Sequence, residues 1–309
     1  MGMKKIIAVI VTRNRRLLLS ECLESLSKQT RTLEKIIVID NDSTDKTKTF
    51  MENLVKDSNN LEYIRLPKNM GPAGGFNRGI KEAYGQGADF VWIMDDDCEP
   101  SKTCLKELIN ANDFIEKEEG GSGFVASSVY SPKGEIMNVP KISKKINNAN
   151  EFSYAQYLEK GLLRVDNATF VSVLFSRNFI SQEGYPIKEM FIWGDDTEYS
   201  YRASNKYPTF MAGKAKTTHK KSSGRLTTIF EEQNPEIIKL YYRYYRNNTY
   251  SLLKYESKTH KIITLINWLT LKPLKALICG KGGLQKASSI FFGTFAGFFF
   301  KPKIEIPEN

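Results

Sequence analysis

The sequence predicts an α/β protein in which a mostly parallel sheet is flanked by helices, with a helical extension at the C-terminal end. Through the first half of the chain, apolar runs of strand length alternate with segments of helical periodicity. The apolar run 90–94 leads directly into three aspartates, and open α/β sheets bind ligands at the carboxyl ends of their strands. The last part of the chain becomes rich in lysine and aromatic residues.

The size and composition of the chain are those of a folded protein with one main domain and an appendage. Its 309 residues are enough to bury a substantial core, and its hydrophobic content is 41%. The four cysteines show neither metal-ligand spacing nor a disulfide pattern, which predicts reduced thiols inside the cell. Residues 1–11 have only a short apolar run and no cleavage site, so we expect the first strand there and not a signal peptide.

The order of the expected elements indicates how the sheet is built. Strands that alternate with helices imply parallel pairing with right-handed crossovers. The segment 135–159 is polar and poorly periodic, so we expect a loop there. The expected strands are 5–11, 35–39, 61–66, 90–94, 168–175 and 209–212, and the expected helices are 15–27, one capped by residues 43–45, one that opens at the turn 69–79 and ends near Gly85, and 200–204.

Three adjacent carboxylates, Asp95, Asp96 and Asp97, follow the strand 90–94. Their mutual repulsion costs stability unless a cation or hydrogen-bond donors offset it. Carboxylate oxygens suit Mg²⁺ or Mn²⁺, ions that commonly complete their coordination with substrate phosphates. The alternative is a solvated acidic turn, and the position directly after a buried strand favours the cation.

A glycine-rich turn opens the helix after the third strand. Its glycines, Gly75 among them, fit neither a dinucleotide-binding pattern nor a Walker A pattern. The turn also carries Arg78, whose guanidinium suits diphosphate oxygens, and a helix N-terminus after a strand can bind anions. A contact with substrate and a plain tight connection both remain open for this turn.

A second pair of carboxylates, Asp195 and Asp196, follows the apolar residues 191–193. A helix that begins there would place Asp195 and Glu198 on one face. The alternative is a helix whose first turn is acidic because the macrodipole favours it. His219 is one of only two histidines, and it can be a metal ligand only if the fold brings it to the first acidic cluster.

The basic charge of the chain is concentrated in its tail. The net charge is +10, and residues 257–303 contain eight lysines and no acidic residue. Phenylalanines crowd 291–300, but lysines and a proline interrupt the apolar windows before they reach the length of a spanning helix. This pattern favours an interfacial segment attracted to anionic lipid, with packing on the core or on a second subunit as alternatives. We find no motif for binding nucleic acid.

Over roughly residues 6–219 the chain resembles the family 2 glycosyltransferases, which have the GT-A fold. The order and number of the motifs carry this resemblance. The versions WIMDDD, AGGFNRG, WGDDTEY and YYRYYRN are most similar to the galactofuranosyl- and rhamnosyltransferase branch. The matching segments are 11–15, 22–26 with Gln29 and Thr30, 38–45, 69–79, 92–97 and 193–199.

The resemblance implies a role for individual residues. Asp196 would be the general base. The acceptor would be bound by Trp193, Asp195 and Glu198, and a Mn²⁺ or Mg²⁺ ion by Asp95, Asp97 and His219. The nucleotide sugar would be held by Thr12, Arg13, Asn14, Asp40, Asn41, Gly75, Arg78, Asp95 and Asp96.

Two residues depart from the family pattern. Arg13 stands where an aromatic residue is common, and Asn41 stands where an aspartate often reads uracil. An amide oxygen can still accept a hydrogen bond from a base N–H. The donor nucleotide, UDP or dTDP, therefore stays open.

We expect residues 1–235 to form the GT-A domain and residues 236–309 to form a helical extension for a membrane or oligomer contact. The expected activity is inverting, metal-dependent transfer of a galactofuranose-, rhamnose- or galactose-class sugar to a glycan or lipid-linked acceptor in cell-surface polysaccharide synthesis. Inversion requires a base on the side of the donor sugar opposite the metal. The sequence has two acidic sites, one for the metal and one for the base. A non-catalytic sugar-binding protein and a sugar nucleotidyltransferase are the alternatives. The expected location is cytoplasmic, at the inner membrane face.

Overall fold

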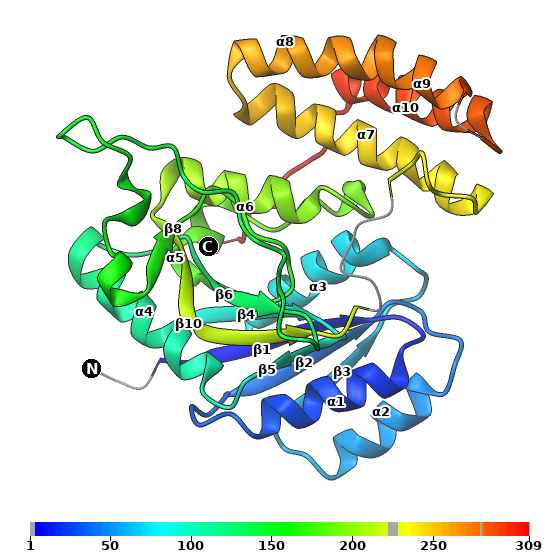
Figure 1. The fold of residues 1–309 in the computed structure, drawn as a ribbon. Coiled ribbons are helices and arrows are strands. Elements are labelled where there is room, and N and C mark those ends of the chain that lie inside the picture. Colours follow the sequence, from blue (N-terminus) through cyan, green and yellow to red (C-terminus); the bar gives the residue numbers. More distant parts are fainter. Residues whose placement is uncertain (1–3, 222–227, 279, 309) are drawn as a thin grey trace.

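The computed structural model describes residues 4–221, 228–278 and 280–308, and one mixed sheet forms its centre (Figure 1). Along the sheet the strand order is β3-β2-β1-β4-β9-β6-β10-β5, with β7 beside β6 and β8 beside β10. The strands are β1 (Ile6–Thr12), β2 (Lys35–Asp40), β3 (Leu61–Arg65), β4 (Phe90–Asp95), β5 (Cys98–Pro100), β6 (Phe124–Tyr130), β7 (Ile136–Met137), β8 (Leu162–Arg164), β9 (Val173–Ser176) and β10 (Thr209–His219).

Strands β3, β2, β1 and β4 are parallel and form the half of the sheet that the alternating pattern predicts. Strand β1 is buried along its whole length because helices cover both faces of the sheet. Helices α1, α2 and α4 cover one face, and α3, α5 and α6 cover the other. Their bounds are α1 (Arg16–Ser27), α2 (Thr47–Lys56), α3 (Gly71–Gly85), α4 (Cys104–Glu119), α5 (Arg177–Glu183) and α6 (Asp195–Lys206).

The second half of the sheet departs from simple alternation. Strand β9 pairs antiparallel with both β4 and β6, which makes the sheet mixed. The strand expected at 168–175 begins only at Val173, whereas the one expected at 209–212 continues to His219 as β10. The register of β10 against β6 shifts between Ala212 and Lys216, as at a β-bulge. Because β10 is longer than expected, its last residue, His219, pairs with β5.

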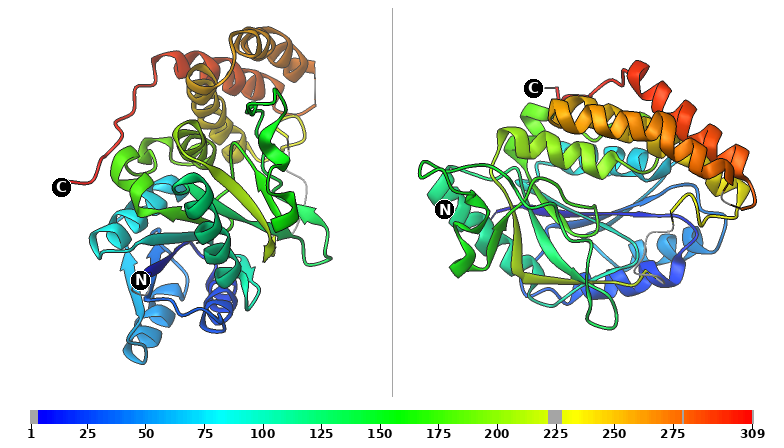
Figure 2. Two further views of the ribbon diagram at one scale, coloured as in Figure 1. Left: turned by 90° about the vertical axis from the view of Figure 1, so that its left-hand side faces the viewer. Right: turned by 45° about the horizontal axis from the view of Figure 1, so that its top comes forward.

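The predicted C-terminal helices are present as a layer that lies against α6 (Figure 2). Two glycines let α10 approach α7 closely. A Cβ on Gly293 would lie 2.5 Å from the carbonyl oxygen of Tyr242, and one on Gly297 would lie 2.4 Å from Cβ of Thr249. In the described ranges, no helix has the length and apolar character needed to cross a bilayer. The layer consists of α7 (Pro235–Tyr255), α8 (Lys258–Ile266), the π-helical turn Asn267–Leu271, α9 (Lys272–Ile278) and α10 (Gly283–Phe299).

After α10 the chain returns to the sheet domain. The N–H of Tyr185 donates to the carbonyl oxygen of Glu305 over 2.9 Å. The carboxylate of Glu305 forms ion pairs with Lys188 and, over 3.5 Å, with Lys81. The helical layer is therefore attached to the sheet domain at both of its ends. The division at residues 235 and 236 stays a prediction, although α7 begins at Pro235.

Candidate active site

The three aspartates lie at the carboxyl edge of the parallel strands: Asp95 ends β4, and Asp96 and Asp97 form the turn before β5. Thr12, at the end of the neighbouring strand β1, donates from Oγ1 to a carboxylate oxygen of Asp96 over 2.7 Å. The guanidinium of Arg15 donates from Nη1 to Asp96 over 3.2 Å and to Asp97 over 3.0 Å. The fold thus offsets the repulsion of the carboxylates with a hydroxyl donor and a cation.

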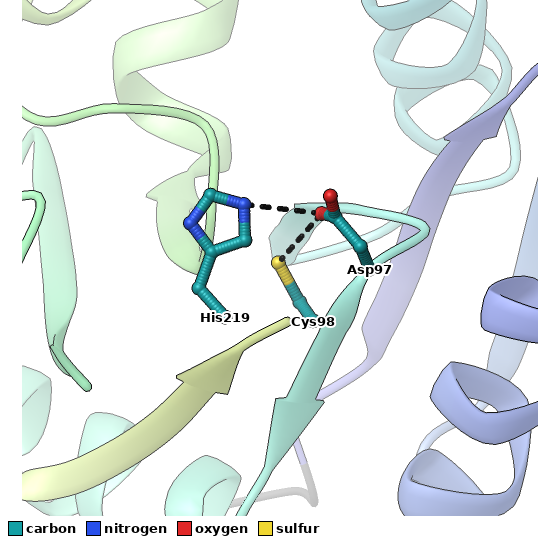
Figure 3. Close-up of side chains that lie close together, drawn as sticks. All are labelled: Asp97, Cys98 and His219. Atoms are coloured by element: carbon teal, nitrogen blue, oxygen red, sulfur yellow. Dashed lines mark hydrogen bonds and ion pairs between the residues drawn. The ribbon is translucent and has the colours of Figure 1, made fainter. Parts of the chain in front are cut away.

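The pairing of β10 with β5 brings His219 to this cluster, because the antiparallel register sets His219 opposite Cys98. The imidazole Nε2 lies 3.2 Å from Oδ1 of Asp97 (Figure 3). On the other side of the ring, Nδ1 lies 2.9 Å from Oδ1 of Asn138. His219 is almost fully buried, so its ring is held in one orientation between two oxygen atoms.

The carboxylates of the cluster titrate differently. Burial raises the pKa of Asp95 well above its ordinary value, and the charges of Asp97 and Asp96 raise it further. Burial also raises the pKa of Asp96, to about 6, against the opposing charge of Arg15. For Asp97, burial favours the neutral form, but the hydrogen bond and charge of His219 outweigh it and the pKa is lowered. Asp97 is therefore the member that stays most readily ionised.

Asp97, Cys98 and His219 present three ligand atoms within 4.8 Å of one another (Figure 3). A carboxylate oxygen and an imidazole nitrogen suit Mn²⁺ or Mg²⁺, and Asp95 supplies a further carboxylate from the same turn. Burial raises the pKa of the Cys98 thiol well above its ordinary value, so the thiol stays protonated. The residues fit a divalent cation held mainly by oxygen and nitrogen. The spacing of the cysteines in the sequence does not indicate that Cys98 lies at this site. It lies here because β5 pairs with β10.

The second pair of carboxylates opens α6. Gly194 precedes the helix with φ of +91°, a left-handed conformation that glycine adopts without strain. Burial raises the pKa of Asp195 to about 8, and the charge of Asp196 raises it further. Burial also raises the pKa of Asp196, although its Oδ1 accepts a 2.7 Å hydrogen bond from the N–H of Thr197. A carboxyl whose pKa is raised toward neutrality suits proton transfer.

The two acidic sites act on one another electrostatically. The charge of Asp195 contributes to the raised pKa of Asp95, which requires the two groups to lie near each other. Tyr244 belongs to α7, and its phenol has a pKa raised by burial and, to a lesser extent, by the charge of Asp196. Residues of the sheet domain and of the helical layer therefore both act electrostatically on the second acidic pair or respond to it.

Trp193 lies in the loop between Met190 and α6. Its φ of +60° is unusual for a bulky residue, which marks a locally strained backbone. Its ring packs against Tyr241 and Tyr244, with ring centroids 4.9 Å and 6.2 Å away. The indole is only partly buried, so one part of it remains available to a ligand.

Glu198 has partners within the protein, and its predicted contact with the acceptor stays a prediction. Its side chain is fully buried and forms an ion pair with Arg202 inside α6. The hydroxyl of Tyr255 donates to it over 2.7 Å, and Lys254 lies 3.5 Å away. The helical spacing places Glu198 on the same face of α6 as Asp195, and α7 covers Glu198. The contacts of Glu198 link α6 to α7.

Several residues expected to hold the nucleotide instead shape the loops around the sheet edge. Asp40 is fully buried and accepts hydrogen bonds from the N–H of Ser43 over 2.8 Å and from the hydroxyl of Tyr63 over 2.5 Å. Asn41 accepts from the N–H of Met70 over 2.7 Å. Both side chains support the loops at the sheet edge, and their contacts with a nucleotide stay predictions.

Asn14 and Arg13 differ in their surroundings. Asn14, with φ of +57°, accepts through Oδ1 from the N–H of Thr44 over 2.7 Å, which fixes the loop after β2. The side chain of Arg13 is exposed at this edge. Of this group, Arg13 is the side chain whose position leaves it open to a nucleotide.

The glycine-rich turn is explained by packing. A Cβ on Gly75 would lie 2.5 Å from Cγ1 of Val11, so glycine lets α3 lie directly on β1. This close approach accounts for a glycine at position 75, and the contact of Gly75 with a nucleotide sugar stays a prediction. Arg78 is half-exposed and pairs with Glu82 on the same helix over 3.0 Å. Neither residue reaches the acidic cluster through a contact in the described residues.

The sheet order and the two acidic sites define the class of fold. The chain superimposes on TarS 1–349 of S. aureus in complex with UDP with a TM-score of 0.58 and 18% identity, covering 90% of this chain and 76% of that one. It superimposes on GalNAc-T7 with UDP, GalNAc and Mn²⁺ with a TM-score of 0.62 and 14% identity, covering 93% and 54%. This is the GT-A fold.

Sequence comparison points to the same family as the motifs. Residues 7–154 match the model of glycosyl transferase family 2. The galactofuranosyltransferase GlfT1 of Mycolicibacterium smegmatis is 36% identical over 98 residues, 32% of each chain. The GalNAc(5)-diNAcBac-PP-undecaprenol beta-1,3-glucosyltransferase of Campylobacter jejuni is 34% identical over 155 residues, 46% of this chain and 47% of that one. These matches span a third to a half of the relatives' length.

Proposed function

We propose that the protein is an inverting, divalent-metal-dependent glycosyltransferase that moves a sugar from a nucleotide diphosphate donor to a glycan or lipid-linked acceptor. The observation that carries this proposal is the presence of two neighbouring acidic sites with different surroundings. One joins Asp97 to a buried histidine, and the other places Asp195 and Asp196 at a helix N-terminus. A displacement with inversion needs a group on each side of the donor sugar.

The first site suits the leaving diphosphate. Asp95, Asp97 and His219 would hold the cation, which when bound neutralises the charge that develops on the departing nucleotide. Arg15 already spans Asp96 and Asp97 and has a half-exposed side chain, so it supplies positive charge on the same side. Thr12 keeps Asp96 turned toward the sheet.

The second site suits the acceptor. An acceptor hydroxyl is a weak nucleophile at neutral pH, and a carboxylate that takes its proton helps it to attack. We assign this role to Asp196, with Asp195 as the neighbour that shares the charge of the pair. The partly buried ring of Trp193 offers an apolar surface against which a sugar can stack.

We propose the donor from the proteins to which this chain is similar. TarS was crystallised with UDP, and GalNAc-T7 with UDP, GalNAc and Mn²⁺. Two of the relatives are a galactofuranosyltransferase and a glucosyltransferase that acts on an undecaprenol-linked glycan. These names support a UDP-sugar, Mn²⁺ and a lipid-linked acceptor, with galactofuranose as the first sugar to test.

Incubation with Mn²⁺ and a panel of UDP- and dTDP-sugars tests the activity by release of free nucleotide, with and without candidate acceptors. Asp196→Asn should keep UDP binding and lose transfer. His219→Ala and Asp97→Ala should weaken Mn²⁺-dependent UDP binding. The proposal fails if no sugar nucleotide is turned over, or if Asp196→Asn transfers sugar at the wild-type rate.

We further propose that the helical layer rests on the surface of a membrane, on its cytoplasmic face. Thirteen large apolar side chains of the layer are at least 40% exposed, and we call them the apolar face. The segment 257–303 that contains them carries eight lysines and no acidic residue. The apolar face consists of Ile262, Ile263, Ile266, Leu271, Leu274, Leu277, Ile278, Leu284, Phe291, Phe292, Phe295, Phe298 and Phe299.

An anionic lipid surface fits these observations better than a second copy of the chain. Helices with exposed apolar side chains and nearby lysines bind in the plane of such a surface. A symmetric dimer through the same face would bring the lysines of two copies together, and like charges oppose such a contact. The buried free thiols of Cys22, Cys98 and Cys104 agree with the cytoplasmic side.

Co-sedimentation of the full chain with vesicles tests this location. We expect binding to vesicles that contain phosphatidylglycerol, weaker binding at high salt, and loss of binding in Phe292→Ser/Phe299→Ser. Phe152→Ser is a matched control, because Phe152 is 55% exposed but lies outside the layer. Equal pelleting of all three proteins, or a dimer that persists with no vesicle binding, would overturn the location.

A further inference from the structure

A single side chain of the helical layer holds the loop that leads into the candidate base. Asn247 of α7 is completely buried. Its Nδ2 donates to the carbonyl oxygens of Met190, Ile192 and Trp193 over 2.9, 3.1 and 2.7 Å. One amide group therefore binds three carbonyls of the segment 190–193, more than 50 positions earlier in the chain.

The loop has an unusual backbone that needs such support. Phe191, Trp193 and Gly194 all have left-handed φ values, of +66°, +60° and +91°. Residues other than glycine rarely adopt positive φ values, and such a backbone persists only where surrounding contacts enforce it. The carbonyl of Met190 also accepts from the N–H of Ile192 over 2.8 Å, so Asn247 matters most for the carbonyls of Ile192 and Trp193. The residue that follows is Asp195.

The orientation of the Asn247 amide is fixed from its other end. Its Oδ1 accepts from Nη2 and Nε of Arg246 over 2.8 and 3.0 Å. Arg246 in turn donates to the carbonyl oxygen of Glu189 over 2.8 Å and stacks on the ring of Phe300. The amide oxygen thus faces a cation and the amide nitrogen faces the loop, so the two ends are not interchangeable.

We infer that Asn247 is a positioning residue for the candidate base: it sets the course of residues 190–194 and so the place at which α6 begins with Asp195 and Asp196. The helical layer then completes the active site and is not a separate appendage. This inference rests on the proposed function of Asp196. It concerns the place of the base and leaves the metal side unchanged.

The matched pair of variants is Asn247→Asp and Asn248→Asp. The first keeps the shape of the side chain and its contacts with Arg246, but turns an oxygen toward three carbonyl oxygens. The second introduces the same charge one position along α7, where the amide of Asn248 donates only within its own helix, to the carbonyl of Tyr244. Asn247→Ser removes the amide without adding charge and serves if the aspartate variant is poorly folded.

We expect kcat for transfer to fall about 100-fold in Asn247→Asp, because a misplacement of about 1 Å at the reacting groups has that effect. The KM for the donor and the Kd for UDP with Mn²⁺ should stay within about twofold of wild type, since the residues proposed to hold the metal and the diphosphate lie outside this loop. Asn248→Asp should keep kcat near the wild-type value. A loss of UDP binding together with transfer would show a merely structural role and overturn the inference, as would an unchanged kcat.

Hydrogen–deuterium exchange separates this inference from the proposed function. In Asn247→Asp, and equally in Asn247→Ser, amide exchange should rise in peptides that cover residues 189–197 and stay unchanged across β1 and β4. This readout needs no active enzyme, so it stands even if the wild-type protein transfers no sugar. Unchanged protection of this loop in both variants would show that Asn247 does not hold it.

Discussion

The imidazole Nδ1 of His219 lies 2.9 Å from the amide oxygen of Asn138, while Nε2 of the same ring faces Asp97. An amide oxygen can only accept, so Nδ1 carries a hydrogen, and a cation would bind at Nε2 in place of the hydrogen that this nitrogen donates to Asp97. Asn138 itself has φ of +50°, and it belongs to the polar segment that the sequence predicts to be a loop. That loop therefore contributes to the candidate metal site.

Asn138→Ala should weaken Mn²⁺ binding by about 10- to 100-fold, because the ring of His219 loses the partner that fixes its orientation. Electron paramagnetic resonance of free Mn²⁺ in titrations with the protein measures this directly. Asn148→Ala, at an exposed position in the same loop, is the control and should bind Mn²⁺ like the wild type. Equal affinity in both variants would remove Asn138 from the site.

The rate of transfer should depend on the ionisation of Asp195 and Asp196. The base acts in its ionised form, and burial raises both pKa values, that of Asp195 to about 8. The value of kcat/KM should therefore fall as the pH falls through this range, well above the ordinary pKa of a carboxyl. Asp195→Asn should move this acid limb to lower pH, because one of two coupled carboxyls is removed. A profile that is flat from pH 5 to 8 in the wild type contradicts the assignment.

Gly75→Ala should destabilise the protein by about 1–3 kcal/mol through overpacking against Val11. Gly85→Ala is the control, since a Cβ there meets no atom within 4 Å, and its effect should be neutral or slightly stabilising. Chemical denaturation measures both. A stable Gly75→Ala variant that has lost UDP binding would instead support the predicted contact with the donor.

Glu198→Gln should lower stability by about 3–5 kcal/mol, because Arg202 then keeps a buried charge without its partner. The KM for the acceptor should change little in the fraction that is folded. Glu24→Gln, which removes an exposed ion pair with Lys28, should leave stability unchanged. The observation that would count against this view is a stable Glu198→Gln protein with a raised KM for the acceptor.

The sequence was sufficient where the signal is local. The run into Asp95, Asp96 and Asp97 could be placed at a strand end because its residues are contiguous and apolar strands in alternating patterns are buried. The helix expected at 200–204 is present as part of α6, which begins earlier, at Asp195 directly after Gly194.

What could not be predicted depends on pairing between distant segments. His219 reaches Asp97 through the register of β10 against β5, and no local pattern encodes that register. Glu198 and Asp195 share a helix face by spacing, but only the packing of α7 decides which of them is covered. No sequence pattern indicates the role of Asn247, because an asparagine in a helix is ordinary. Its role follows only from the carbonyls to which it donates.

The attachment of the helical layer to the sheet domain at two places bears on which acceptors can extend to Asp196. Asn247, in the middle of α7, holds the loop of residues 190–194, and Glu305, beyond α10, contacts Lys188 and Tyr185, so the layer is joined to the sheet domain at two places. If the apolar face rests on a membrane as proposed, that membrane would lie at a fixed distance from Asp196. Only acceptors whose reactive hydroxyl extends over that distance would then be used, so the helical layer would select acceptors by the length of their stem.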